Sequence, residues 1–209
     1  MTATKSTRLL EWAREIQALA QTGSHYAENQ YQRDRCIRLG EIAAEMMSVH
    51  TNIEPPILIK AFQSQTGYAT PKVDVRSAVF RDNKLLMVRE IFDGGWTMPG
   101  GWADVGDIPS RAAERETWEE SGFRVRSSRL LGVYDANRTQ PLEVFHAFKI
   151  VFLCDILGGR PRPSSETSEV CFFGLDEMPE NLSGERTTLR HIRDAFAAMN
   201  NPEYPAVFD

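Results

Sequence analysis

The sequence is poor in cysteine and has no long hydrophobic run. Its 209 residues include three cysteines, Cys36, Cys154 and Cys171, whose spacing fits neither a metal site nor a set of disulfide pairs. No apolar run approaches the length of a membrane span, and residues 1–6 lack the apolar stretch of a secretory signal. These absences argue against a membrane protein or a disulfide-rich secreted protein, and predict a cytoplasmic protein with reduced cysteines.

Positive charge is also scarce. The chain has 24 Lys and Arg against 29 Asp and Glu, a formal net charge of −5. Broad electrostatic binding to duplex nucleic acid requires a basic surface, so nucleic acid is not the expected partner, although a local basic pocket for phosphates is still allowed. At 42% hydrophobic and 25% charged residues, the composition is that of an ordinary globular protein.

The first third of the chain has helical periodicity. Residues 6–23 and 25–49 carry apolar side chains at helical spacing, and Pro55 and Pro56 fit the first turn of a third, shorter helix. Three helices have little apolar surface of their own and must bury a face elsewhere. We therefore expect residues 1–67 to form a helical domain that mediates dimerisation, with a direct role in substrate binding as the alternative.

Strand patterns begin after a connector at residues 68–72. Runs rich in β-branched and aromatic residues predict strands at 73–80, 84–90, 130–134, 144–157 and 170–175, and a final helix is expected at 185–199. The first two runs form a hairpin. Together with a helix between the second and third runs, this order predicts an α/β domain over residues 68–209, with a mixed sheet between helices.

The intervening helix has recognisable start and stop signals. Asp107 is placed to accept hydrogen bonds from the free amides of its first turn, Pro109 suits that turn, and Gly122 is suited to the left-handed conformation that ends a helix. Within it, three glutamates fall at i, i+3 and i+4 and share one face: Glu116, Glu119 and Glu120. Adjacent carboxylates repel, and hard oxygen ligands suit Mg²⁺ or Mn²⁺, although a solvated acidic face is the simpler alternative.

The surroundings of this helix favour the metal. Gly101, Asp107, Arg115-Glu116, Glu119-Glu120 and Gly122 stand at the spacing of the signature box of the Nudix hydrolases, and residues 96–101, Trp-Thr-Met-Pro-Gly-Gly, are similar to the turn that precedes it. The resemblance implies an α/β/α sandwich and hydrolysis of a nucleoside diphosphate linked to another group. Two positions depart from the usual pattern, because Asp107 stands in place of Glu and Thr117 in place of an aliphatic residue.

The resemblance also implies roles for individual residues. Glu116 and Glu120 are expected to bind the metal directly, Glu119 to be a ligand or to support one, and the carbonyl of Gly100 or Gly101 to add an oxygen ligand. Arg115 is expected to hold a carboxylate of the box in place through a charge-assisted hydrogen bond.

The base that activates water varies within the family. Glu166 and Glu169 follow a turn-rich segment at 158–165, where a mobile loop could bring a carboxylate to the metal or close the site. Glu119 or Glu120 is the alternative base. Both loop glutamates also fit a simpler role as solvated charges.

Candidate substrate contacts lie outside the box. Arg76 and Arg89 interrupt otherwise apolar strands and would suit bidentate binding of phosphate, unless they face outward as ordinary polar positions. Trp96 and Trp102 flank the Pro-Gly-Gly turn and are candidates for stacking, with core packing as the alternative. The weaker candidates near a probable loop are Asp135, Asn137, Arg138 and His146.

The whole chain resembles one Nudix branch with a helical N-terminal domain. The connector at residues 67–76 and the turn at 101–104 add to that resemblance. It implies a homodimer that hydrolyses nucleoside diphosphates linked to a second moiety, with CDP-choline, giving CMP and phosphocholine, as the expected substrate. ADP-ribose, giving AMP and ribose 5-phosphate, is the alternative substrate. A non-catalytic nucleotide-sensing regulator is the alternative of another class, and secondary activity on RNA ends remains open.

Overall fold

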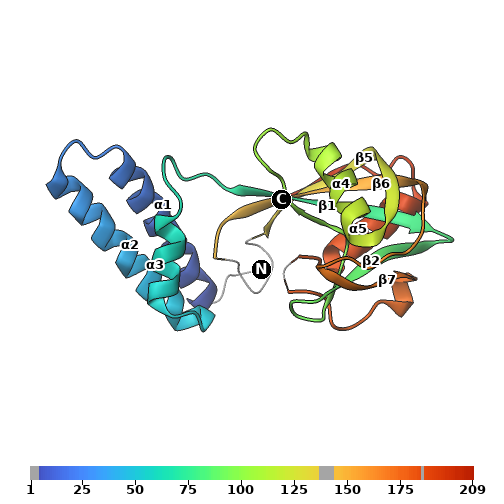
Figure 1. Ribbon diagram of the computed structural model, residues 1–209, viewed down its shortest axis with the longest axis horizontal. Helices are drawn as coiled ribbons and strands as arrows, with labels where there is room; N and C mark the ends of the chain where they lie inside the picture. Colours follow the sequence, from blue (N-terminus) through green and yellow to red (C-terminus); the bar gives the residue numbers. More distant parts are fainter. Residues whose placement is uncertain (1–4, 137–143, 185) are drawn as a thin grey trace. The chain divides into compact units, whose positions relative to one another are not determined.

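The computed structural model describes residues 5–136, 144–184 and 186–209, and the chain forms two compact units (Figure 1). The helical unit comprises residues 1–71 and 142–146, and the sheet unit comprises residues 72–141 and 147–209. Within the described ranges, none of the helices combines the length and the apolar character needed to cross a bilayer.

Three helices build the helical unit, as the sequence predicts: α1 (Lys5–His25), α2 (Gln30–Thr51) and α3 (Pro55–Gln63). Figure 1 shows them, in blue to teal, packed side by side. Their shared core contains six buried side chains: Leu10, Ala13, Ala44, Met47, Leu58 and Phe62. The amphipathic patterns of the three segments therefore meet in one small core.

Two helix boundaries differ from the expected ones. α1 continues through Gly23 to His25, because Gly23 lies against α2, where an added Cβ would come within 2.8 Å of Cys36 Sγ. α2 begins at Gln30, because Asn29 caps it by accepting a hydrogen bond from Gln32 N. Glycine at 23 thus serves close packing of two helices.

The sheet unit is built on an eight-stranded mixed sheet. Its main order is β3-β2-β1-β6-β5-β8, with β4 paired to β1 and β7 paired to β2. The strands are β1 (Lys72–Arg81), β2 (Lys84–Glu90), β3 (Trp96–Thr97), β4 (Gly100–Trp102), β5 (Phe123–Asp135), β6 (Ala147–Gly159), β7 (Thr167–Phe173) and β8 (Val207–Phe208). β1 is parallel to β6 and β5 to β8, and the other pairs are antiparallel.

The two faces of the sheet are covered by different helices. On β1, Val75 packs with Ala112 and Ala113 of α4 (Pro109–Ser121), whereas Ala78 packs with Ile192 of α5 (Leu189–Asn200). Odd and even residues of a strand point to opposite faces. The expected α/β/α sandwich is therefore confirmed.

Several boundaries in the sheet unit also correct the expectations. β5 begins at Phe123 rather than near 130, because its first half pairs with the end of β6. β6 begins at Ala147, since Val144 and Phe145 pack instead against the core of the helical unit. α5 begins at Leu189 rather than near 185, because Thr188 caps it by accepting a hydrogen bond from His191 N.

Candidate active site

The Pro-Gly-Gly turn brings the backbone of β4 against β1. Gly100 has φ +146°, and a Cβ added to it would lie 2.0 Å from the carbonyl oxygen of Val75. No other residue type fits this backbone conformation and this spacing together. The sequence therefore fixes the turn through the glycine at position 100.

α4 carries the three glutamates and has one unexpected boundary feature. Ile108 is its N-cap residue, and Asp107 accepts hydrogen bonds from Asp104 N at 3.1 Å and from Arg115 at 2.9 Å. The prediction that Asp107 caps the helix is therefore wrong, because its carboxylate is engaged by the preceding turn and by Arg115. Gly122 ends the helix with φ 76°, as expected.

Two of the three carboxylates meet the backbone of the turn. Glu120 is 5% exposed, and its Oε2 accepts a hydrogen bond from Gly100 N at 2.9 Å. The Glu116 carboxylate lies over Gly101, where an added Cβ would be 3.1 Å from Oε2. Burial raises the pKa of Glu120 to about 7, against the lowering effect of Arg76, and burial also raises the pKa of Glu116.

Arg115 connects the acidic groups on the outer side of the helix. It donates to Glu116 Oε1 at 2.6 Å and to Asp107 Oδ2 at 2.9 Å, and it lies 3.5 Å from Glu119 Oε2. The hydrogen bond to Glu116 is the one that the sequence predicted. Glu119 is exposed and faces this arginine, so its role as a metal ligand stays a prediction.

Arg76 lies in the core rather than open to a cleft. It is 3% exposed and forms a bidentate ion pair with Asp74 at 2.8 and 2.9 Å, and it also donates to Met98 O at 3.2 Å. Lys149, on the neighbouring strand, lies 3.7 Å from Asp74. The structure thus corrects the expected phosphate-binding position of Arg76, because Asp74, two residues away on the same strand face, holds its guanidinium.

Glu90 is a buried acid near the site that the sequence analysis did not select. It ends β2, is 7% exposed and forms an ion pair with Arg186 at 2.8 Å. Its charge is one of the factors that raise the pKa of Glu120, so the two side chains influence each other. A charged residue directly after an apolar strand was the available signal.

The segment after β6 is anchored to the end of α4. Arg162 N donates to Ser121 O at 2.9 Å, and Thr167 Oγ1 donates to Glu120 O at 2.7 Å. Glu166 is exposed within this segment, whereas Glu169 lies on β7 and pairs with Arg89 at 2.6 Å. Two residues with separately expected roles therefore bind each other.

The remaining candidates are distributed differently. Trp96 is buried and meets Phe173 edge to face, which is core packing. Trp102 on β4 is 45% exposed, so its ring is accessible to a ligand. Arg138 and Asn137 lie outside the described residues. Asp135 ends β5, and His146 belongs to the helical unit.

Glu116, Glu120 and the glycine backbone fit the donor set of a divalent cation. Mg²⁺ is usually bound through one or two carboxylates together with waters and substrate phosphates. Across the ranges that the structure describes, no group of three or more His, Cys, Asp or Glu side chains is gathered as a metal cluster. Two buried acids whose pKa values are raised by burial are the charges that a cation would stabilise.

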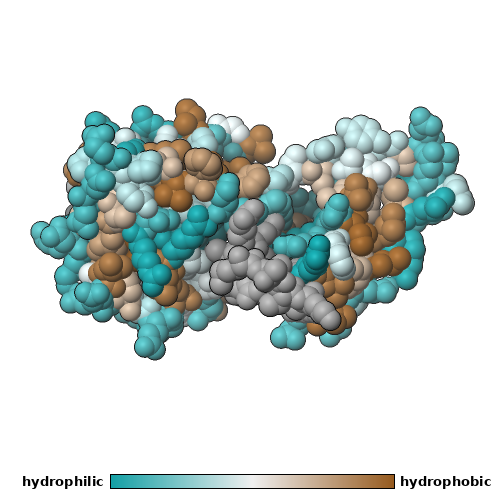
Figure 2. Space-filling model, turned by 180° about the vertical axis from the view of Figure 1, so that it is seen from behind, coloured by the Kyte–Doolittle hydropathy of each residue, from teal (hydrophilic) through white to brown (hydrophobic). Residues whose placement is uncertain are grey.

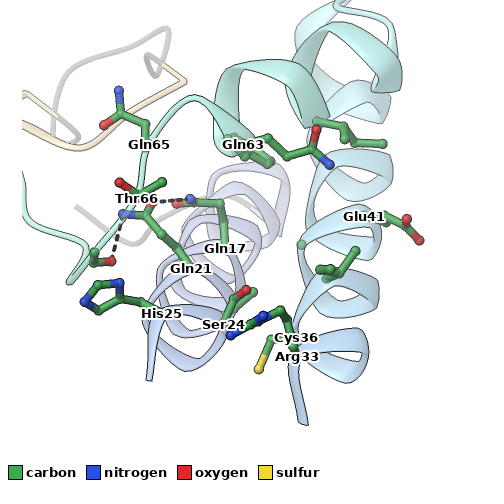
Figure 3. Close-up of a pocket in the computed structure, with 16 residues that line it drawn as sticks. Gln17, Gln21, Ser24, His25, Arg33, Cys36, Glu41, Gln63, Gln65 and Thr66 are labelled. Atoms are coloured by element: carbon green, nitrogen blue, oxygen red, sulfur yellow. Dashed lines mark hydrogen bonds between the residues drawn. The ribbon is translucent and has the colours of Figure 1, made fainter. Parts of the chain in front are cut away.

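A larger hollow lies in the helical unit (Figure 3). It has a volume of about 490 Å³, and Gln21 crosses its wall to donate a hydrogen bond to Gly67 O, while Gln17 donates to Gln21. Glu41 is the one carboxylate on its lining. The paired acids needed for metal-dependent hydrolysis are therefore those of α4 and not those of this hollow.

Comparison with known families agrees with this geometry. Residues 70–195 match the model of the NUDIX domain, and residues 7–62 match a model described as a UDP-X-like, N-terminal oligomerisation domain. The chain belongs to the Nudix family. It is accordingly a Nudix pyrophosphohydrolase, and the resemblance inferred from residues 101–123 is confirmed.

Relatives of this Nudix protein match both units. A Bacillus subtilis protein named "Putative ADP-ribose pyrophosphatase YjhB" is 36% identical over 97% of this chain and 98% of its own length. The crystal structure of a UDP-X diphosphatase has a TM-score of 0.63 and 29% identity, covering 99% of this chain and 100% of that one. An ADP-ribose pyrophosphatase from Streptococcus suis has a TM-score of 0.62 and 34% identity, covering 67% of this chain and all of its own.

Proposed function

We propose that this Nudix protein hydrolyses the diphosphate linkage of a nucleoside diphosphate-X substrate with Mg²⁺ or Mn²⁺ held by Glu116 and Glu120. The observation that carries the proposal is that both carboxylates lie against the Gly100-Gly101 backbone. A divalent cation bound there would neutralise charge on the diphosphate and supply an activated water. Arg115 orients Glu116, and Gly100 N orients Glu120.

Two substrates have specific support. The names of two relatives, one of them similar over almost the whole chain, favour ADP-ribose. The resemblance of the helical domain and connector to one Nudix branch favours CDP-choline. Both contain the same reacting group, so the box acts alike on either, and the contacts outside the box decide between them.

A substrate panel tests this proposal. With Mg²⁺ or Mn²⁺, product release from ADP-ribose, CDP-choline, a UDP-sugar, NADH and a nucleoside triphosphate is measured as kcat/KM. We expect the preferred diphosphate-X compound to exceed the triphosphate at least about tenfold, a difference of about 1.4 kcal/mol, and EDTA to abolish turnover. A preference for the triphosphate would contradict the substrate class. Absence of cleavage with tight nucleotide binding would support a regulator.

The two loop glutamates are expected to differ as candidates for the base. Glu169 is held by Arg89, whereas Glu166 is exposed beside the segment that is anchored to the end of α4. Glu166→Gln should therefore lower kcat by about 10²-fold or more, the usual contribution of a general base. Glu169→Gln is the matched control and should stay within about twofold of the wild type. Equal, full activity of both variants would place the base elsewhere.

The helical unit is proposed to hold a homodimer together. Figure 2 shows hydrophobic side chains gathered on the helical unit, and its exposed large hydrophobic residues include Trp12, Leu19, Val49 and Ile57. The description of the matching N-terminal model as an oligomerisation domain supports the same proposal. Light scattering should give a mass of about 47 kDa, twice the 23.7 kDa of one chain; a monomer at micromolar concentration would disprove it.

A further inference from the structure

A second hollow lies at the C-terminal end of α4, within the sheet unit. Its volume is about 400 Å³, and its lining residues are Trp118, Gly122, Gly159, Arg160 and Arg162. Successive helix residues are rotated by about 100°, so Trp118 lies on the side of α4 opposite Glu116 and Glu120. The hollow is therefore separate from the carboxylates that define the active site.

Positive charge and an aromatic ring are combined there. The guanidinium of Arg162 lies 5.0 Å from the centre of the Trp118 ring, and that of Arg124 lies 5.8 Å from it, yet the tryptophan remains 40% exposed. None of Arg124, Arg160 and Arg162 forms an ion pair with a carboxylate in the part of the chain that the structure describes. Three guanidinium groups thus remain available to an anion.

The wall of the hollow is held in place before any ligand binds. A Cβ on Gly122 would lie 2.6 Å from Arg160 O, so only glycine lets the two segments approach this closely. Arg162 N donates to Ser121 O, and Thr167 Oγ1 closes the same segment onto Glu120 O. Ordering a loop costs binding energy, and here that cost is already met within the fold.

We propose that Trp118, Arg160 and Arg162 form a binding site for a nucleotide, whose base stacks on the tryptophan and whose phosphate binds the arginines. Arginine binds phosphate bidentately, and a half-exposed tryptophan accepts a nucleobase on its free face. A volume of about 400 Å³ is within the range of small-molecule sites. The C-terminal end of α4 carries a partial negative charge of about half a unit, which the full charges of the arginines outweigh.

Calorimetric titration of the full chain with AMP or CMP in EDTA tests the proposal without turnover. EDTA removes divalent ions, so phosphate binding by the active-site carboxylates does not contribute. We expect binding below about 1 mM, weakened at least about tenfold for each arginine changed in Arg160→Gln and Arg162→Gln, as for loss of a charged hydrogen bond. Trp118→Leu should weaken the nucleotides but not pyrophosphate.

Two control variants distinguish binding in this hollow from binding elsewhere on the protein. Arg193→Gln, an exposed arginine on α5 at the other face of the sheet, and Glu120→Gln should both leave binding unchanged. Circular dichroism of each variant verifies folding. Equal weakening by Arg193→Gln, loss of binding in Glu120→Gln, unchanged binding in both arginine variants, or pyrophosphate binding as tightly as AMP would each overturn the proposal. The outcome does not depend on which substrate the enzyme hydrolyses.

Discussion

Replacing Glu120 with glutamine is expected to lower kcat by about 10³-fold or more, which corresponds to roughly 4 kcal/mol of lost transition-state stabilisation. Glutamine keeps the volume of the side chain and an oxygen that accepts from Gly100 N, but removes a negative charge that would hold a divalent cation. The charge stabilisation that such an ion gives to a phosphoryl oxygen is worth several kcal/mol. The effect should therefore appear in kcat with each substrate that the protein cleaves.

The stability of this variant should change little. Glu120 is buried and burial already raises its pKa to about 7, so the neutral glutamine suits its surroundings. Thermal unfolding distinguishes lost chemistry from lost folding, and Glu119→Gln provides the exposed counterpart on the same helix. Near-normal kcat of Glu120→Gln, with an unchanged Tm, would disprove the metal assignment.

Replacing Asp74 with asparagine is expected to destabilise the sheet unit by about 3 kcal/mol or more. Asp74 forms a bidentate ion pair with Arg76 and lies 3.7 Å from Lys149, and all three side chains are buried. Asparagine removes the charge and leaves the buried cations without that carboxylate. A loss of this size corresponds to a fall in Tm of about 6–12 °C for a domain of this size.

Asp107→Asn is the matched control, because its ion pair with Arg115 is partly exposed and should be worth less than about 1 kcal/mol. The pH dependence provides a second criterion. Burial opposes the Asp74 carboxylate, but Arg76 and Lys149 hold its pKa below the usual value. Its contribution is thus present above about pH 4, the pKa of an unfolded Asp, and is lost as pH falls through the lower folded value. The difference between wild type and Asp74→Asn should shrink in acid, and equal losses for Asp74→Asn and Asp107→Asn at neutral pH would contradict this account.

The local parts of the site could be predicted from the sequence alone. The spacing of Glu116, Glu119 and Glu120 places them on one side of a helix whatever else the chain does, because helix geometry is set by the backbone. Gly100 and Gly122 were equally predictable, since their backbone conformations favour glycine. The helical pattern of the first segments and the alternation of the first two strands likewise predicted the two structural classes and their order.

The tertiary structure decided which side chains meet. Asp74 and Lys149 are 75 residues apart and face each other because β1 and β6 are paired in parallel; that register turned Arg76 from an expected phosphate ligand into part of a buried ion pair. Glu169 was expected to be free but lies opposite Arg89 in the β2–β7 pair. Local propensity acts within a few residues, whereas strand register and burial depend on distant segments, so the sequence determined the acidic helix and its turn, and only the fold determined the partners of its charges.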